Sequence, residues 1–421
     1  MATNQAADRV IVVFDGSANP TTQAETLRRV AGIAQVASTA DFRGQAVDMN
    51  RLDVAQATVY AELGIAVVDA DADQAAALRA DPGGGILAVE PERVFRPLGT
   101  PVPGPTGGSD DYVRGYRDGV ADLAGRLLPG TGAAGVREIF ADTDAYTWGL
   151  QAVGADRTSA TGAGTKIAIL DTGYTADHPD FADRPIAAQS FVAGEEAADT
   201  HGHGTHCVGT AAGPANPPTT RRYGVATDAE IHVGKVLGND GSGSDANILA
   251  GINWALASGC QVVSMSLGAD VREPSVAYER VGSRALAAGT LIVAAAGNNA
   301  QRPGDEGFVG VPANSPSVMA IAAVDQELGI APFSAAGTSV DGGQIDLAGP
   351  GVDVYSSWLM PQRYNTISGT SMATPHVAGL AALWHERTGA TGRDLWTLLT
   401  QRARRLPAPS TDVGGGLALA P

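Results

Sequence analysis

From about Trp148 onward, apolar runs alternate with helical stretches, and this alternation limits the possible folds more than any other feature. Five runs are expected to be buried strands: 166–170, 230–236, 261–266, 290–295 and 318–324. Helices are expected at 203–212, 244–258, 275–288, 372–387 and 392–404. Near-continuous apolar strands separated by helices are typical of a parallel sheet that is covered on both faces. The sequence therefore predicts a doubly wound α/β fold, with its site at the carboxyl ends of the strands.

The N-terminal part has a different pattern. Strands are expected at 9–14, near 54–60, at 64–69 and at 86–90, and helices at 21–37 and 71–80. The order β-α-β-β-α-β predicts a small α+β unit of ferredoxin-like type.

A Pro- and Gly-rich stretch separates these two parts of the chain. Residues 97–109 read PLGTPVPGPTGGS, a composition that favours a linker or an exposed loop, and a short helix is expected within 111–127. We therefore divide the chain into a first unit at 8–97, a linker at 98–145, a main domain at 146–410 and a tail at 411–421.

Charge and composition exclude several classes of function. The formal net charge of −17 gives an acidic surface that repels phosphate, so nucleic acid is not an expected partner. No run approaches the roughly 18 apolar residues of a membrane span, and no membrane association is expected. The two cysteines, Cys207 and Cys260, exclude a disulfide framework, and we expect two buried free thiols.

Three segments carry residues that could perform nucleophilic hydrolysis. Asp171 ends a strand in IAILDTG, His203 enters a helix in HGHGTHCVGT, and Ser371 begins a helix in GTSMATPHVAG. Each lies where a doubly wound sheet places its site. A hydroxyl, a base that takes its proton and a carboxylate that orients the base are what such a reaction needs.

Together these motifs resemble the signatures of the subtilisin-like (S8) serine peptidase family, whose chain order is also Asp, His, Ser. The resemblance covers roughly 146–390 and rests on DTG with a downstream HPD, on HGTHCVG and on GTSMATPHVAG. The pair His206-Cys207 resembles proteinase K-like members. The end of the first unit, LRADPGGGILAVEPERVF, resembles the inhibitor-type propeptide of the same family.

The resemblance implies a serine endopeptidase that works through an acyl-enzyme. Ser371 would attack the scissile carbonyl, His203 would act as general base and then general acid, and Asp171 would orient His203. Asn298, in AAAGNN, would donate a hydrogen bond to the oxyanion beside the Ser371 backbone N–H. The enzyme would be an autoprocessed zymogen, inhibited by its own prodomain and cut somewhere in 97–146.

The resemblance also implies how a peptide or protein substrate would bind. Two segments match the edges that pair with an extended substrate: Gly241, Ser242 and Gly243, and Ser266, Leu267 and Gly268. Recognition would then be strand addition. Gly310 falls where the family has a glycine at the floor of the S1 pocket, which suggests room for a large apolar side chain. Asp245 stands where the family often has an aromatic lid over S4.

No cofactor is expected for the chemistry, but the resemblance suggests structural Ca²⁺. Asp180, in HPDF, matches a family calcium ligand, and Asp325 with carbonyls near Pro312 is a candidate for a second site. His201, His203, His206 and Cys207 could also be read as zinc ligands. The glycines at 202 and 204 argue against a rigid zinc cage.

Two alternative functions stay open from the sequence. The N-terminus has neither the basic region nor the apolar stretch of a signal peptide. A dedicated cytoplasmic processing peptidase for one precursor is therefore one alternative, and the protein would be secreted if a signal peptide had been removed. A non-catalytic peptide-binding protein is the other alternative. A monomer is expected.

Overall fold

The computed structural model describes residues 9–16, 18–42, 55–81, 83, 85–98, 100–101, 138–339 and 342–421. The helix expected within 111–127 lies outside these ranges.

The main domain is built on a seven-stranded sheet with the order β16-β15-β14-β12-β8-β10-β9, in which every neighbouring pair is parallel. The strands are β8 (Lys166–Asp171), β9 (Ile186–Ser190), β10 (Glu230–Lys235), β12 (Val262–Met265), β14 (Leu291–Ala295), β15 (Met319–Val324) and β16 (Leu347–Pro350). The five strands predicted from apolar runs are all present. The predicted doubly wound α/β fold is confirmed.

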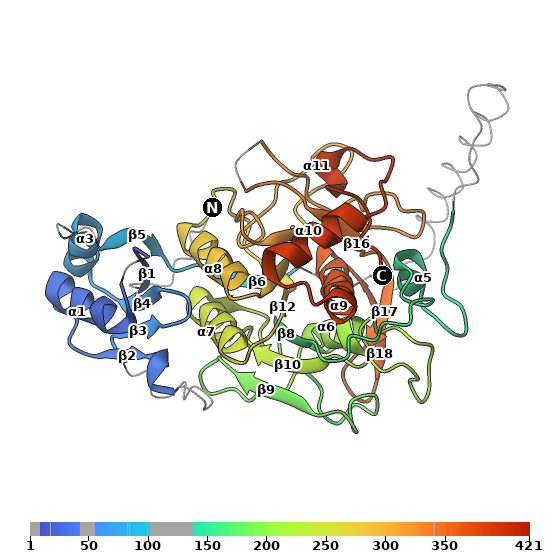
Figure 1. Ribbon diagram of the computed structural model, residues 1–421, viewed down its shortest axis with the longest axis horizontal. Coiled ribbons are helices and arrows are strands. Elements are labelled where there is room, and N and C mark those ends of the chain that lie inside the picture. Colours follow the sequence, from blue (N-terminus) through green and yellow to red (C-terminus); the bar gives the residue numbers. More distant parts are fainter. Residues whose placement is uncertain are drawn as a thin grey trace.

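Helices cover both faces of this sheet (Figure 1). They are α5 (Trp148–Val153), α6 (His203–Ala212), α7 (Asp245–Ala257), α8 (Val276–Ala287), α9 (Thr370–Thr388), α10 (Gly392–Arg402) and α11 (Ser410–Val413). Helices α6 and α9 pack on each other and on one face, and α7 and α8 lie on the other. The buried part of α9 runs without interruption from Thr370 to Leu383, so this helix passes through the core.

The first unit is a five-stranded sheet with the order β2-β3-β4-β1-β5. Its elements are β1 (Arg9–Phe14), α1 (Pro20–Ala31), β2 (Val36–Ser38), the 3₁₀ turn Thr39–Phe42, β3 (Ala57–Tyr60), β4 (Ile65–Asp69), α3 (Ala72–Ala80) and β5 (Ile86–Pro91). Strands β3, β4, β1 and β5 are antiparallel neighbours in the ferredoxin-like order. The first helix ends earlier than expected because Gly32 adopts a left-handed conformation (φ 65°), which is a common helix stop.

Strand β1 is buried on both faces, which explains why its sequence is continuously apolar. Val10, Val12 and Phe14 belong to the core of the first unit, under α1 and α3. Ile11 and Val13 belong to the core of the main domain, and β1 packs against α8. Side chains alternate along a strand, so one strand joins two cores.

Six short strands lie outside the two large sheets. Strand β6 (Val94–Pro97) runs between β11 (Gly243–Ser244) and β13 (Leu267–Gly268) and is antiparallel to both. Strand β7 (Thr100–Pro101) pairs with β18 (Tyr364–Ser368), which also pairs with β17 (Val354–Ser357).

The C-terminal residues are not the separate tail that we expected at 411–421. Val413, Leu417 and Ala418 are buried in the main core, and Leu417 bridges to both Ala348 and Arg404. The short apolar segment GLALA is held because its carbonyl and amide groups find partners on neighbouring strands, which sequence composition alone does not indicate. Residues within 411–421 therefore pack as part of the main domain.

Two further expectations can be compared with the structure. Cys207 and Cys260 are both free and buried, as predicted. Among the described residues, no helix is long and apolar enough to cross a membrane.

Candidate active site

The predicted Asp, His and Ser residues meet at the carboxyl edge of the main sheet. Asp171 is the last residue of β8 and His203 is the first residue of α6. The Nδ1 atom of His203 lies 2.8 Å from Oδ1 of Asp171. Ser371 lies in the first turn of α9, and all three side chains are buried. A helix N-terminus favours the negative charge that would develop there.

The Asp171 carboxylate controls the charge of His203. Burial of the ring opposes its protonation, but the nearby charge of Asp171 outweighs burial and raises the pKa of His203 well above its usual value of 6.5. Asp171 therefore stabilises the charged, imidazolium form of His203.

The Ser371 hydroxyl does not face His203 in this structure. It donates a hydrogen bond of 2.8 Å to the backbone oxygen of Ser266. The Nε2 atom of His203 is buried and has no hydrogen-bond partner among the described residues. A turn of the Ser371 side chain toward this free Nε2 would complete the Ser-His-Asp arrangement.

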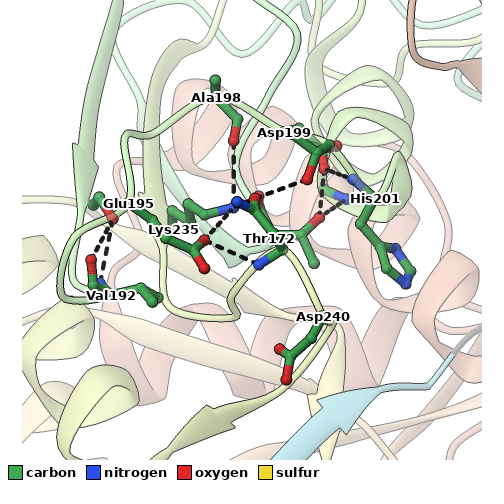
Figure 2. Close-up of polar contacts among 12 residues, drawn as sticks. Thr172, Val192, Glu195, Ala198, Asp199, His201, Lys235 and Asp240 are labelled. Carbon is green, nitrogen blue, oxygen red and sulfur yellow. Dashed lines mark hydrogen bonds and ion pairs between the residues drawn. The ribbon is translucent and has the colours of Figure 1, made fainter.

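Asp199 holds the start of the helix that carries His203 (Figure 2). Its Oδ1 accepts hydrogen bonds from Thr172 Oγ1 and from the backbone amides of His201 and Gly202. Its Oδ2 accepts from the amide and the hydroxyl of Thr205, at 2.9 and 2.6 Å. One carboxylate thus fixes the turn before His203 to the residue after Asp171.

Lys235, the last residue of β10, connects the loop after Asp171 to the loop before His203 (Figure 2). Its ammonium group is fully buried and donates to the backbone oxygens of Thr172 (2.8 Å) and Ala198 (3.3 Å). It also donates to Asn239 Oδ1 and lies 3.4 Å from Glu195 Oε2. A buried cation needs such partners, and here they lock the loops on either side of Asp171 and His203.

The backbone carbonyl of Leu98 lies where an oxyanion would form. Its oxygen accepts hydrogen bonds from the backbone N–H of Ser371 (3.3 Å) and from Nδ2 of Asn298. The other amide atom of Asn298, Oδ1, accepts from the N–H and the hydroxyl of Thr370. These two bonds fix which end of the Asn298 amide points at Leu98.

The chain before Leu98 lies between the two edge segments that we predicted for substrate. Phe95 and Val94 pair with Gly243 and Ser244, and Pro97 and Arg96 pair with Leu267 and Gly268. The amide of Leu98 donates to the backbone oxygen of Ser266 at 3.2 Å. Of the predicted edge residues, Gly241 and Ser242 lie outside this ladder, and Ser242 bonds to Asp240 instead.

Glycine at position 268 makes room for the side chain of Leu98. A Cβ atom added to Gly268 would lie 2.8 Å from Leu98 Cδ1. Gly310, which we predicted at the floor of the same pocket, lies against Ala269, because an added Cβ there would meet the Ala269 oxygen at 2.4 Å. Of these two glycines, Gly268 is therefore the one that lies against the Leu98 side chain.

The surroundings of Asp180 do not fit a Ca²⁺ ion. Its Oδ2 accepts a 2.5 Å hydrogen bond from Tyr223, and Tyr364 Oη lies 3.2 Å from both carboxylate oxygens. Burial and the Asp180 charge raise the pKa of Tyr223 well above 10.0, so this phenol stays a neutral donor. Ca²⁺ requires several oxygen ligands that face it as acceptors, whereas here two hydroxyls donate to the carboxylate.

The other residues that we considered as metal ligands also have protein partners. Oδ1 of Asp325 accepts from the amides of Glu327 and Gly329. His206 Nε2 contacts the Val354 oxygen at 2.9 Å, and burial lowers the pKa of His206 to about 3. Among the described residues, the one group of three candidate ligands is Asp171, His203 and Cys207, which is the Asp171–His203 pair with the neighbouring thiol.

Sequence reasoning missed several residues of this site. Leu98, Asp199 and Lys235 were not singled out. For Asp199 a signal existed, since an Asp shortly before a helix start is a common capping residue. For Leu98 none existed, because its place depends on pairing between segments far apart in the chain.

A buried Asp-His pair beside a serine at a helix start, with two donors converging on a carbonyl oxygen, defines a serine hydrolase site. The comparisons with known proteins agree with this class. The chain belongs to the subtilase family (peptidase family S8), whose model matches residues 162–416, more than half of the chain.

Individual relatives are similar over the same region. Subtilisin DY of Bacillus licheniformis is 40% identical over 240 residues, which cover 56% of this chain and 83% of that protein. Subtilisin Savinase of Lederbergia lenta is 42% identical over 240 residues (56% and 82%). M-protease of Shouchella clausii is 40% identical over 250 residues, and this match covers 58% of the present chain and 61% of that protease. The chain is a subtilisin-like serine endopeptidase, and its reaction needs no cofactor.

Proposed function

We propose that this endopeptidase is made as a zymogen whose first unit fills the active site and is cut off by Ser371 between Leu98 and Gly99. One observation carries the proposal: the Leu98 carbonyl oxygen accepts from Ser371 N–H and Asn298 Nδ2. Donors in this position stabilise the oxyanion of a tetrahedral intermediate. Strands β6 and β7 hold the chain on both sides of the bond.

The reaction follows from the positions of these groups. Oγ of Ser371 attacks the Leu98 carbonyl carbon while Nε2 of His203 takes the hydroxyl proton. His203 then gives this proton to the departing nitrogen of Gly99, and Leu98 is left as an ester on Ser371. Water, deprotonated by His203, hydrolyses the ester to a carboxylate and restores Ser371. Asp171 keeps His203 oriented throughout.

After the cut, the first unit would remain as a competitive inhibitor. Its contacts do not depend on the cut bond: Glu90 accepts from Ser275 Oγ (2.6 Å) and from the Val276 amide (2.7 Å). Glu92 accepts from the amide of Ala246, and the hydroxyl of Tyr60 donates to the backbone oxygen of Ala246. Together with the β6 ladder, these contacts support the role of an intramolecular inhibitor.

Other substrates would be peptides and unfolded protein segments that bind as an extended strand. The β6 ladder is made of backbone bonds, which are available to any sequence. Side-chain preference would come from pockets, and the space over Gly268 supports an apolar residue such as leucine immediately before the cut.

The intact mass of the purified full chain tests this proposal. Wild type is expected to yield two fragments that meet between Leu98 and Gly99, and Ser371→Ala is expected to stay at full length. Leu98→Asp should slow processing, because it places a charge over Gly268 in an apolar pocket. A cut at another bond in wild type, or full-length wild type after prolonged incubation, contradicts the proposed site.

The two alternative functions make different predictions. A non-catalytic peptide-binding protein would leave Ser371 unlabelled by a fluorophosphonate after removal of the first unit. A peptidase dedicated to one precursor would leave denatured casein largely intact. We expect labelling of Ser371 and cleavage of casein at many sites.

We propose Asp325 as the remaining candidate for structural Ca²⁺, since the donors around Asp180 do not fit that ion. The support comes from the resemblance to the family. Since Oδ1 of Asp325 already accepts from the amides of Glu327 and Gly329, its other oxygen, Oδ2, would have to hold the ion. A rise in melting temperature with added Ca²⁺ that disappears in Asp325→Asn would support the site. An equal rise in wild type and Asp325→Asn, or no rise at all, would exclude it.

A further inference from the structure

Asp245 extends the ladder between β6 and the main domain beyond the strands themselves. It is the first residue of α7, and its side chain is fully buried. Its amide donates to the Arg93 oxygen at 3.2 Å, and its Oδ2 accepts from the Arg93 amide at 2.6 Å. Counted back from the proposed cut, Leu98 is the first residue and Arg93 the sixth.

The side chain of Arg93 brings a positive charge to this buried carboxylate. Nη1 of Arg93 lies 3.8 Å from Oδ2 of Asp245 and donates to Ser275 Oγ at 3.3 Å. Nη2 donates to Glu90 Oε2 at 2.9 Å. Ser275 belongs to the main domain and precedes α8, so the main domain supplies two of the groups around this guanidinium.

The Asp245 carboxylate also lies beside Tyr278. Oδ1 of Asp245 and the Tyr278 hydroxyl are both buried and form no close hydrogen bond with another described residue, and the two side chains interact with each other. Burial and the Asp245 charge raise the pKa of Tyr278 well above 10.0, so the phenol is neutral and near the carboxylate. Burial raises the pKa of Asp245 to about 7, against the effect of Arg93. A buried carboxylate without a cation is costly. Among the described residues, Arg93 forms an ion pair with it, with Nη1 3.8 Å from Oδ2.

The pocket for the fourth residue adjoins this group. The ring of Phe95 is fully buried and meets the ring of Tyr278 edge-on, with 5.6 Å between centroids. The ring of Tyr278 therefore contacts Phe95, the fourth residue before the cut. Its hydroxyl lies close to Asp245, which binds Arg93, the sixth residue. The two positions form one continuous recognition surface on α7 and α8.

We propose that Asp245 is a specificity-determining residue that selects substrates with arginine six residues before the cut. The proposal rests on the proposed function, because the position is counted from the Leu98–Gly99 bond. Arginine suits the site better than lysine, since its planar guanidinium can reach Asp245 and Ser275 together. Arg96, the third residue, is exposed and forms no ion pair within 4 Å of a described residue; its charge acts only through solvent on Asp240, so it should matter little.

Fluorogenic peptides test the preference on enzyme obtained by self-processing of the full chain. One peptide keeps residues 93–98 (RVFRPL) before the cut, and its variants carry citrulline, lysine or alanine in place of Arg93. Citrulline keeps the shape of arginine and removes the charge. For wild type we expect kcat/KM to fall roughly tenfold from arginine to citrulline, as for loss of a partly buried ion pair. Citrulline or alanine in place of Arg96 should change it less than about twofold.

A pair of enzyme variants shows whether Asp245 is responsible. Asp245→Asn should bring the arginine-to-citrulline ratio close to one, whereas Asp394→Asn, on the exposed side of α10, should keep the wild-type ratio. If wild type cleaves both peptides equally well, or if Asp245→Asn keeps the preference, the inference is wrong and the proposed function stands. If wild type cuts none of the peptides, the proposed function fails. Because the citrulline comparison needs only wild type, poor folding of Asp245→Asn does not remove the test.

Discussion

The side-chain amide of Asn298 is held in one orientation, because its oxygen accepts two hydrogen bonds from Thr370. Its Nδ2 therefore stays directed at the carbonyl of Leu98. Asn298→Ala should slow self-processing by about 10²–10³, the loss in kcat known for the corresponding donor of subtilisin itself. A time course of intact mass measures this rate, and Thr397→Ala on the exposed face of α10 serves as control. Processing of Asn298→Ala at the wild-type rate would exclude this donor role.

The charge of His203 sets the pH dependence of the same reaction. Only the neutral ring can accept the proton of Ser371, and Asp171 raises the pKa of His203 well above 6.5 in spite of burial. As the pH falls through this raised pKa, the ring becomes protonated and processing should stop. We expect the midpoint of the acid limb above pH 6.5 in single-turnover processing rates. A rate that is still maximal at pH 6 would contradict this assignment.

At the scale of elements, β1 connects the first unit to the main domain, because its two faces belong to the cores of the two parts. Ile11 lies on the face that packs against α8, and its truncation to alanine removes contacts between the two parts. Ile11→Ala should shorten the delay between cleavage and the appearance of peptidase activity, because the cut first unit leaves sooner. Mass spectrometry follows cleavage, and peptide hydrolysis follows activity. Leu87→Ala, at an exposed position of β5, should keep the wild-type delay. If Ile11→Ala keeps it too, the β1–α8 contact does not govern release.

The elements that the sequence predicted share one property, which is a long run of similar residues. Strands β8, β12, β14 and β15 are mostly apolar, β10 (EIHVGK) carries apolar residues at alternate positions, and each was expected within a residue or two. Strands β9 (IAAQS), β16 (LAGP) and β18 (YNTIS) were not expected, because small and polar residues there become strands only through pairing with neighbours.

The residues of the site also fall into those that the sequence could predict and those that it could not. Asp171, His203, Asn298 and Ser371 could be predicted because each lies in a distinctive local motif. The register of β6, the contact of Leu98 with Asn298 and the hydroxyls on Asp180 could not, because each joins segments that are distant in sequence. Long-range pairing leaves no local pattern from which to read it.

At the scale of the whole molecule, the proposed cleavage site and Ser371 belong to one chain, and the Leu98 carbonyl already lies beside Ser371 N–H. Strands β6 and β7 bind the segment on either side of Leu98–Gly99 to the domain that would cut it. The proposed cleavage is therefore unimolecular. Its half-time should not change when the protein is diluted roughly a hundredfold, over a range in which a bimolecular rate would fall in proportion. Intact mass at several concentrations measures this, and a half-time that lengthens on dilution would show cleavage between molecules.

Release of the first unit should have different kinetics from its cleavage. Strand β1 carries Ile11 and Val13 on the face that α8 covers, and the cut unit can leave only by exposing this aliphatic row to water. A partly unfolded, extended segment is also what the cleft binds, so each freed enzyme can digest the inhibitors that its neighbours let go. We therefore expect activation to be self-accelerating and irreversible, with a slow onset in each population followed by a rapid rise once the first active molecules appear.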